Sequence, residues 1–236
     1  MNTVNEDSIE VIAYYRSDMP EKFGVPRQSG LAPHLKGRIV FEEKYSDLNA
    51  FDGLDGFDRV WIIWRFDVKD DDTFRAKVRP PRLGGNTYMG VFATRSPFRP
   101  NHMGLTCAKI EEIGTDENGR CYIGVSGADM MDGTAVYDVK PYLPYADSYP
   151  DARGGFAQEE SHLGHRLVVS IPPEIEEQFS TQQLEGLREI LSLDPRPSYQ
   201  NDPTRVYGLM YAGKNIRFKV DGVNLEVLID TKQPQI

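Results

Sequence analysis

The sequence lacks any apolar stretch of the kind that crosses a membrane. A bilayer-spanning helix needs about 20 consecutive apolar residues, and even the apolar run Val60–Trp64 ends after a few positions. The first residues, MNTVNEDSIE, are polar and acidic, which is atypical of a signal peptide. We therefore expect a cytoplasmic protein without membrane contact.

Cysteine is scarce, and the histidines do not cluster. The two cysteines, Cys107 and Cys121, form no CxxC pair, so we predict two reduced thiols rather than a disulfide or a structural zinc site. We predict no metal, because none of the four histidines has the spacing of metal ligands. These histidines are His34, His102, His162 and His165.

Acidic residues are missing from one stretch of an otherwise acidic chain. The net charge of −9 argues against binding of DNA or RNA by the whole surface. Between Arg75 and Lys109, however, there is no Asp or Glu. This island predicts a local site for an anion, although chance clustering on a solvated face would give the same pattern. Its cations are Arg75, Lys77, Arg79, Arg82, Arg95, Arg99 and Lys109.

A GxGxxG fingerprint and long helices between strands are also absent, which argues against a Rossmann-type α/β sheet. Instead, the first two thirds of the chain alternate short β-branched and aromatic segments with turn sequences such as DENG and DGT. This pattern favours a mainly β fold, either a barrel or a sandwich. The predicted strands cover residues 8–17, 37–42, 57–66, 87–94, 105–114, 121–127 and 134–140.

The segment 57–66 is the clearest of these strands. Its even positions, such as Val60 and Trp64, form one apolar face, whereas the odd positions mix Trp61 and Ile63 with charged residues. A strand buried on both sides would be apolar throughout. One face is therefore expected in the core, and the other against a partner or a site.

The pattern changes after residue 147. Residues 148–161 contain Pro and Gly without apolar periodicity, which predicts a linker between a domain at 1–147 and a small α+β domain at 162–236. Ser180 and Gln183 have the spacing of a capping box that begins a helix, and three short strands follow it. So small a unit is marginally stable alone, so we expect it to dock on the first domain or on a partner.

Three segments combine Pro or Gly with Arg or Asp beside apolar residues. They are FGVPRQSGL (23–31), TRSPFRPNHMG (94–104) and DGTAVYDVKPYLPYAD (132–147). Proline restricts the backbone and lowers the entropy cost of holding a loop in a binding shape. Each segment alone has a structural explanation as a solvated turn or packing corner, but the three together indicate a binding site on a rigid scaffold.

These motifs resemble those of a known family. GVFATRSPFRPNHMGLT (90–106) is similar to the signature of the TsaA-like, or TrmO, tRNA (adenine-N6)-methyltransferases, and the other two motifs and the segment DPRPSYQ (194–200) also match. The resemblance implies a closed β-barrel that binds S-adenosylmethionine without a Rossmann fold. It also implies a homodimer that methylates N6 of threonylcarbamoyladenosine at tRNA position 37, next to the anticodon.

The same resemblance implies the residues that contact the cofactor. Arg27 or Arg95 would clamp the methionyl carboxylate, Asp132 would accept from ribose hydroxyls or the amino group, and the rings of Tyr137 and Tyr142 would favour the sulfonium. The full set of implied cofactor contacts is Pro26, Arg27, Gln28, Asp67, Val68, Arg95, Leu105, Asp132, Gly133, Thr134 and Ala135.

The catalytic and RNA-binding residues are predicted from residue chemistry within the resemblance. Asp138, Asp147 and Tyr137 are candidates for accepting the N6 proton, and a mechanism with no protein base stays equally open. The cationic island would meet RNA phosphates. The candidate RNA contacts are Arg79, Arg82, Arg99, Arg196, Tyr199 and Arg205.

The chain departs from the family pattern at two places. It has His102-Met103 where the family usually has Pro-Ile, which predicts a looser loop, and Asp67 near a position that is commonly His. These departures support an alternative, a non-catalytic S-adenosylmethionine sensor of the same fold. A third hypothesis is a methyltransferase for another adenine or a small molecule. The C-terminal segment DPRPSYQ (194–200) and its cations favour an RNA enzyme over a sensor.

Overall fold

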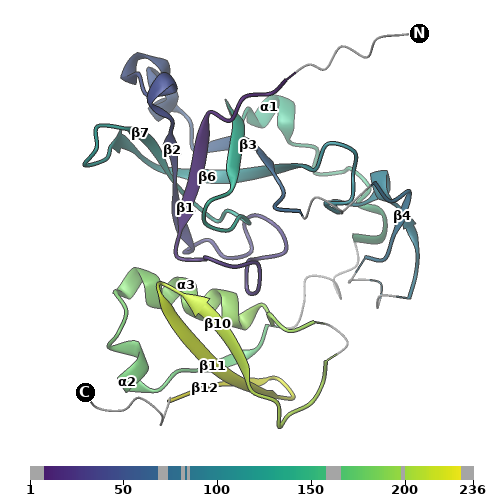
Figure 1. The fold of residues 1–236 in the computed structure, drawn as a ribbon. Helices are drawn as coiled ribbons and strands as arrows, with labels where there is room; N and C mark the ends of the chain where they lie inside the picture. Colours follow the sequence, from purple (N-terminus) through teal and green to yellow (C-terminus); the bar gives the residue numbers. More distant parts are fainter. Residues whose placement is uncertain are drawn as a thin grey trace.

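Six antiparallel strands form a closed barrel (Figure 1). The computed structural model describes residues 8–68, 74–80, 83, 86–157, 166–197 and 200–229. Around the barrel the strand order is β1-β2-β7-β6-β3-β8, which confirms the predicted mainly β fold and its closed barrel. The strands are β1 (Ala13–Ser17), β2 (Lys36–Phe41), β3 (Arg59–Arg65), β6 (Met103–Thr115), β7 (Cys121–Ser126) and β8 (Ala135–Pro141).

The alternation along β3 fills the barrel interior on one side, as the sequence predicts. Val60, Ile62 and Trp64 are buried in the barrel core, whereas Trp61 and Ile63 are only partly covered on the outer face. In the β3–β6 register Trp64 lies opposite Gly104. A side chain at position 104 would overlap the indole of Trp64, so glycine is what lets this large ring enter the core.

The antiparallel order determines which loops share an end of the barrel. Neighbouring strands run in opposite directions, so residues 18–35, 66–102 and 127–134 all connect strands at one end, which we call the motif end. The opposite end carries residues 42–58, the hairpin turn 116–120 and the chain beyond Pro141.

Short elements decorate the barrel. The predicted strand at 87–94 is wrong for most of its length. Only β5 (Met89–Gly90) pairs, with β4 (Lys77–Val78), and the chain then turns into the 3-10 helix η5 (Val91–Ala93), because the amide and hydroxyl of Thr94 both donate to the Val91 carbonyl. The other short helices that precede the C-terminal part are η1 (Glu43–Tyr45), η2 (Leu48–Phe51), η3 (Leu54–Gly56), α1 (Pro144–Asp147) and η6 (Gly155–Ala157).

The C-terminal part is a four-stranded sheet with two helices, as predicted for an α+β unit. Its strand order is β10-β11-β12-β9, and β9 runs parallel to β12. Ser180 and Gln183 form the predicted capping box at the start of α3. The elements are β9 (Val168–Ser170), α2 (Pro173–Glu176), α3 (Thr181–Ser192), β10 (Tyr207–Tyr211), β11 (Lys214–Asp221) and β12 (Asn224–Leu228).

The loop 18–35 of the barrel joins the two parts of the chain. Figure 1 shows α3 on the side of its sheet that faces the barrel. Met19, Ala32 and Leu35 are buried in the same apolar cluster as Leu187 and Phe218 of the C-terminal part. A strand-connecting loop at the motif end therefore packs into the core of the C-terminal part.

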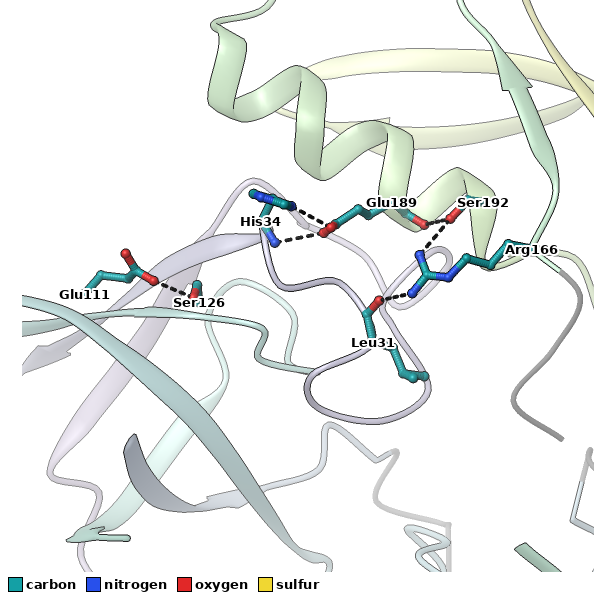
Figure 2. Close-up of polar contacts among 7 residues, drawn as sticks. All are labelled: Leu31, His34, Glu111, Ser126, Arg166, Glu189 and Ser192. Atoms are coloured by element: carbon teal, nitrogen blue, oxygen red, sulfur yellow. Dashed lines mark hydrogen bonds and ion pairs between the residues drawn. The ribbon is translucent and has the colours of Figure 1, made fainter. Parts of the chain in front are cut away.

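Polar contacts complete this junction (Figure 2). The backbone amide of His34 donates to Glu189 Oε2 at 2.8 Å, and its ring Nδ1 lies 2.6 Å from Glu189 Oε1. Arg166 donates to the Leu31 carbonyl at 3.0 Å and to Ser192 Oγ at 3.3 Å. The end of α3 is thus connected to the 31–34 segment directly through Glu189 and, by way of Arg166, through Ser192.

The described residues contain no helix long and apolar enough to cross a bilayer. Within the same ranges, no group of three or more His, Cys, Asp or Glu side chains is arranged to hold a metal ion. Both Cys107 and Cys121 are free thiols, as predicted.

Replacing Gly104 tests the packing of the barrel core. We expect Gly104→Ala to lower the free energy of unfolding by about 1–3 kcal/mol, because the added methyl group forces Trp64 out of its position. Gly56→Ala is the matched control, since nothing lies within 4 Å of the position a Cβ would take there. Equal stability of the two variants in chemical denaturation would refute the packing argument.

The His34–Glu189 contact predicts a dependence on pH. The Glu189 carboxylate raises the pKa of His34 above its usual 6.5, with Glu185 adding to the rise and Lys36 opposing it. Because the pKa is raised in the folded state, the contact stabilises fully below pH of about 6.5 and is lost as pH rises through the raised pKa. In an NMR titration, Glu189→Gln should lower the His34 pKa; an unchanged value contradicts the coupling.

Candidate functional site

The first and central motifs and the start of the third meet at the motif end of the barrel. The Gly30 amide donates to the Gly127 carbonyl at 2.8 Å, which joins the first loop to the segment that precedes the third motif. Arg95 of the central motif donates to Gln28 Oε1 of the first motif at 2.5 Å. Segments far apart in the sequence thus form one surface, as the prediction of a shared binding site requires.

The first motif is held by the C-terminal part. Pro26 is buried, and Arg27 donates from Nη2 to the Arg196 carbonyl at 3.1 Å. Gln28 is half-buried and accepts from Arg95. The position of this motif therefore depends on the segment 194–197 as well as on the barrel.

The central loop is braced by its own side chains. Arg99 Nη1 donates to the carbonyls of Thr94 at 3.0 Å and Ser96 at 3.3 Å. His102 has a φ of 50° and its ring lies 2.7 Å from the Pro97 carbonyl. Proline is incompatible with a positive φ, so here His102 holds the loop by a hydrogen bond. These contacts do not support the looser loop expected from the sequence.

The third motif is anchored on β1. Asp132 Oδ1 accepts from the Ser17 amide at 3.0 Å, and its Oδ2 lies 3.8 Å from Arg16. Gly133 adopts a φ of 79°, which favours glycine. Thr134 is buried and donates to the Met131 carbonyl at 2.8 Å. Ala135 then pairs with β1 as the first residue of β8.

Three further predicted cofactor residues lie near the same end. Asp67 and Val68 follow β3 directly, and the neighbouring Phe66 amide donates to the His102 carbonyl of the central loop at 2.8 Å. Leu105 is close to the start of β6 on its outer face, with 55% of its surface exposed. An exposed apolar side chain at the motif end can pack against the face of an aromatic ring in a ligand.

Asp129 is a site residue that the sequence analysis missed. Thr106 donates its hydroxyl to Asp129 Oδ1 at 2.5 Å and accepts from Trp64 Nε1 at 2.8 Å. Burial raises the pKa of Asp129, and the Thr106 hydrogen bond and the Arg95 charge oppose that rise. A carboxylate thus lies among all three motifs, connected to the barrel core. Its only sequence signal is a lone acid in the run GVSGADMM.

Comparisons with known proteins identify the family of this chain. The chain matches the tRNA-methyltransferase O N-terminal domain model over residues 14–148 and the TrmO C-terminal domain model over residues 164–231. The chain belongs to the tRNA-methyltransferase O family. It is 38% identical over 226 residues to the tRNA (adenine(37)-N6)-methyltransferase of Escherichia coli, which covers 92% of this chain and 95% of that protein.

Two further relatives add to the comparison. A crystal structure of TrmO from Pseudomonas aeruginosa superposes with a TM-score of 0.73 at 30% identity, covering 94% of this chain and 97% of that one. A probable S-adenosyl-L-methionine-binding protein of Methanothermobacter thermautotrophicus is 29% identical over 143 residues, which is 61% of this chain and 95% of that protein. Barrel-sized relatives of the TrmO family therefore exist.

The candidate bases lie at different levels along the barrel, with Asp138 opposite Ile63 at the level of Leu105. Asp147 is beyond Pro141, at the opposite end, where its Oδ2 accepts from Trp61 Nε1 at 2.9 Å and from the Leu143 amide at 2.8 Å. These bonds lower the pKa of Asp147, which makes it a weaker proton acceptor. Asp138 pairs with Lys140 at 2.7 Å on β8, and the half-buried Tyr137 precedes it. Within one chain, Asp147, the last residue of the third motif, therefore lies apart from the first and central motifs.

The predicted RNA contacts divide into two groups. Arg99 and Arg196 are engaged inside the protein, since Arg196 is only 7% exposed and binds both Asp194 oxygens, at 2.8 and 2.9 Å. Arg79 and Arg205 are exposed and lie over the rings of Tyr88 and Tyr207, at 4.5 and 5.3 Å. Arg82 and Tyr199 lie outside the described residues, as do His162 and His165.

The side chains at the motif end fit a zwitterionic nucleoside ligand. Arg27 and Arg95 offer cations for a carboxylate, Asp129 and Asp132 offer carboxylates for an amino group or hydroxyls, and Leu105 offers an apolar face. A site for an inorganic anion alone has no use for two carboxylates. The residue chemistry therefore matches S-adenosylmethionine better than phosphate.

The buried carboxyl of Asp129 predicts a stabilising substitution. Because its pKa is raised in the folded state, the ionised form weakens folding as pH rises above the unfolded value of about 3.8. Asp129→Asn keeps an acceptor for Thr106 without the charge, so its thermal midpoint should exceed that of the wild type at pH 7 and match it near pH 4.

Asp55→Asn serves as the control in this comparison, because Asp55 is an exposed residue of η3. Its thermal midpoint should follow that of the wild type at both pH values. An Asp129→Asn variant that is less stable than the wild type at pH 7 would show that the charge is a net stabiliser.

Proposed function

We propose that this chain is a tRNA methyltransferase that transfers the methyl group of S-adenosylmethionine to N6 of threonylcarbamoyladenosine at tRNA position 37, next to the anticodon. The convergence of the three motifs at one end of the barrel, carried by the Arg95–Gln28 bond, is the main support. The alignment of 92% of the chain with a tRNA (adenine(37)-N6)-methyltransferase supports the choice of substrate.

The cofactor residues are assigned by what each side chain offers. Arg95 binds the methionyl carboxylate, and Gln28 fixes its guanidinium. Arg27 supplies a second cation at the mouth of the site, and Leu105 covers an apolar face of the ligand. Asp132 accepts from hydroxyl or amino groups, while Gly133, Thr134 and Ala135 shape the backbone beside it. When bound, the cofactor supplies an activated methyl group on a sulfonium.

Asp129 acts through Arg95 in this proposal. Its charge lies close enough to Arg95 for the guanidinium to affect its pKa, and the Thr106 and Trp64 hydrogen bonds hold the carboxylate still. A guanidinium that is bonded to Gln28 and attracted by the Asp129 charge is oriented toward the site. Positioning of the two reactants supplies much of the rate in such a transfer, so a fixed Arg95 matters to the chemistry.

The N6 proton has no settled acceptor among the sequence candidates. Asp147 lies at the other end of its own barrel and is tied to Trp61, so it reaches the site only if a second subunit contributes it. A transfer without a protein base is the simpler mechanism for one chain, with the proton leaving to water.

The proposal includes a homodimer in the cytoplasm. The outer face of β3 and β6 carries the partly covered Trp61 and Ile63 beside the exposed Leu105. A second copy that covers this face would bury these apolar side chains next to the cofactor contacts. The tRNA substrate provides the argument for the cytoplasmic location.

A sensor that binds the cofactor without turnover is the second candidate. The relative named as a probable S-adenosyl-L-methionine-binding protein favours it, as does Asp67 in place of the usual histidine. Incubation of the purified protein with methyl-labelled S-adenosylmethionine and tRNA from cells that lack the enzyme separates the two. Label in N6-methylated threonylcarbamoyladenosine supports the methyltransferase, whereas tight cofactor binding without labelled tRNA supports the sensor.

Arg95→Ala should weaken S-adenosylmethionine binding by about 10-fold to 100-fold, because it removes a charge-assisted bond. Arg120→Ala is the matched control, since Arg120 is an exposed arginine in the hairpin at the opposite end, 3.6 Å from Glu42. Asp129→Asn should weaken binding in the wild type but not in the Arg95→Ala background, because it acts through Arg95. Calorimetry measures the cofactor affinity of Arg95→Ala, Arg120→Ala, Asp129→Asn and the variant that combines Arg95→Ala with Asp129→Asn. Additive losses of binding free energy in the combined variant would contradict the coupling.

A further inference from the structure

The segments around β4 and β5 form a ribbon that carries exposed aromatic rings. Phe74 is 50% exposed, Tyr88 53% and Phe92 72%. Phe74 and Phe92 face each other with ring centroids 6.3 Å apart and planes tilted by 30°. Rings that served only the fold would be buried, because exposing apolar surface of this size opposes stability. We therefore expect these exposed rings to contact another molecule.

The ribbon has strand pairing and two buried side chains of its own. Val78 and Val91 are buried, and β4 pairs with β5 at Lys77–Gly90 and Val78–Met89. The buried Val91 directly precedes the exposed Phe92, so the core contact of one residue directs the next outward. In Figure 1 β4 lies to one side of the barrel, at the right.

The ribbon is also joined to the loop that carries Arg95. The Arg75 amide donates to the Phe98 carbonyl at 3.1 Å, and the Arg75 guanidinium lies 3.9 Å from the centre of the Phe98 ring. The Val91 amide donates to the Ala76 carbonyl at 3.0 Å. Phe92 is three residues from Arg95. The rings thus stand beside the proposed methyl-donor site.

The charge around the rings identifies the occupant. Lys77 and Arg79 are exposed on the ribbon, and the sequence has no acidic residue from Phe74 to Ile110 within a chain of net charge −9. Cations interleaved with exposed rings are the features that bind unpaired bases and their phosphates. A partner protein surface would gain little from this concentration of one sign of charge.

We propose that Phe74 and Phe92 are a stacking platform for unpaired bases of the tRNA anticodon loop that flank the methylated adenosine, with Lys77 and Arg79 against the adjacent phosphates. This inference rests on the proposed function, because it takes tRNA as the substrate. A base displaced from a loop stacks readily on an aromatic face. The platform orients the loop so that the target base enters the site at Arg95.

The test uses the full-length protein and a fluorescent anticodon stem-loop RNA, with a duplex RNA of equal length as the second probe. Phe74→Leu and Phe92→Leu keep apolar volume but remove the ring. Each should weaken stem-loop binding by about tenfold, with duplex binding and S-adenosylmethionine affinity unchanged. Leu48→Ala is the control, because Leu48 is an exposed apolar residue of η2, in the blue segment at the upper left of Figure 1.

The salt dependence separates rings from charges. The two Phe variants should keep the wild-type slope of log affinity against log salt, whereas Lys77→Gln should reduce the slope by about one unit. Unchanged stem-loop affinity in both Phe variants would overturn the inference. So would an equal loss for the duplex, or dissociation of the protein in sedimentation, which would make the rings a contact between copies of this chain.

The outcome is distinguishable from failure of the proposed function. If the wild type transfers no methyl group to any tRNA, the proposed function is wrong, independently of the results for the Phe variants. If the wild type methylates tRNA and the Phe variants do so with unchanged KM, only the platform is wrong. A raised KM for tRNA with unchanged kcat on saturating tRNA supports the platform.

Discussion

Closure of the barrel by the pairing of β1 with β8 is the constraint on which the candidate site depends. Ala13 and Tyr14 pair with β8 in the ladder, and the Gly133 amide donates to the Tyr15 carbonyl, so the closure joins the third motif to the end of β1. With all neighbours antiparallel, every second connection lies at the same end. In an open sheet β7 would still lie beside β2, with Lys36 opposite Ser126, but β8 and the third motif at its start would lie at the far edge.

Within that frame the loops are fixed by individual polar contacts rather than by bulk packing. Arg99 and His102 bind carbonyls of their own loop, and Asp132 binds the end of β1. Asp129 is different, because burial disfavours its charge. A carboxylate kept at a cost to folding is typical of binding and catalytic sites. The burial of this carboxylate beside Thr106 is therefore consistent with a binding role for Asp129.

The sequence predicts features that depend on local patterns, but it does not predict those that depend on residues brought together by the fold. The alternation in 57–66 predicts β3 and its buried face, and Ser180 with Gln183 predicts the start of α3, because both signals are local. The strand predicted at 87–94 was wrong because Thr94 turns the chain after Val91. Asp129 was invisible because its role comes from Thr106 and Arg95, which are distant in sequence. Arg99 and Arg196 are residues of the type that contacts RNA phosphates. In the structure, however, the Arg99 guanidinium binds a backbone carbonyl and the Arg196 guanidinium binds a carboxylate.

The uneven distribution of charge along the chain and the junction between its two parts both affect the candidate site. The acidic remainder of the surface repels RNA, so the stretch from Phe74 to Ile110 is where an anion approaches, and steering of this kind raises association rates at low salt. At the other side of the motif end, Arg27 donates to the Arg196 carbonyl. The 31–34 segment is bound by Glu189 of α3 and by Arg166, which precedes β9. Displacing the C-terminal part would therefore disturb the first motif directly. The C-terminal part belongs to the construction of the site, whether or not it touches RNA itself.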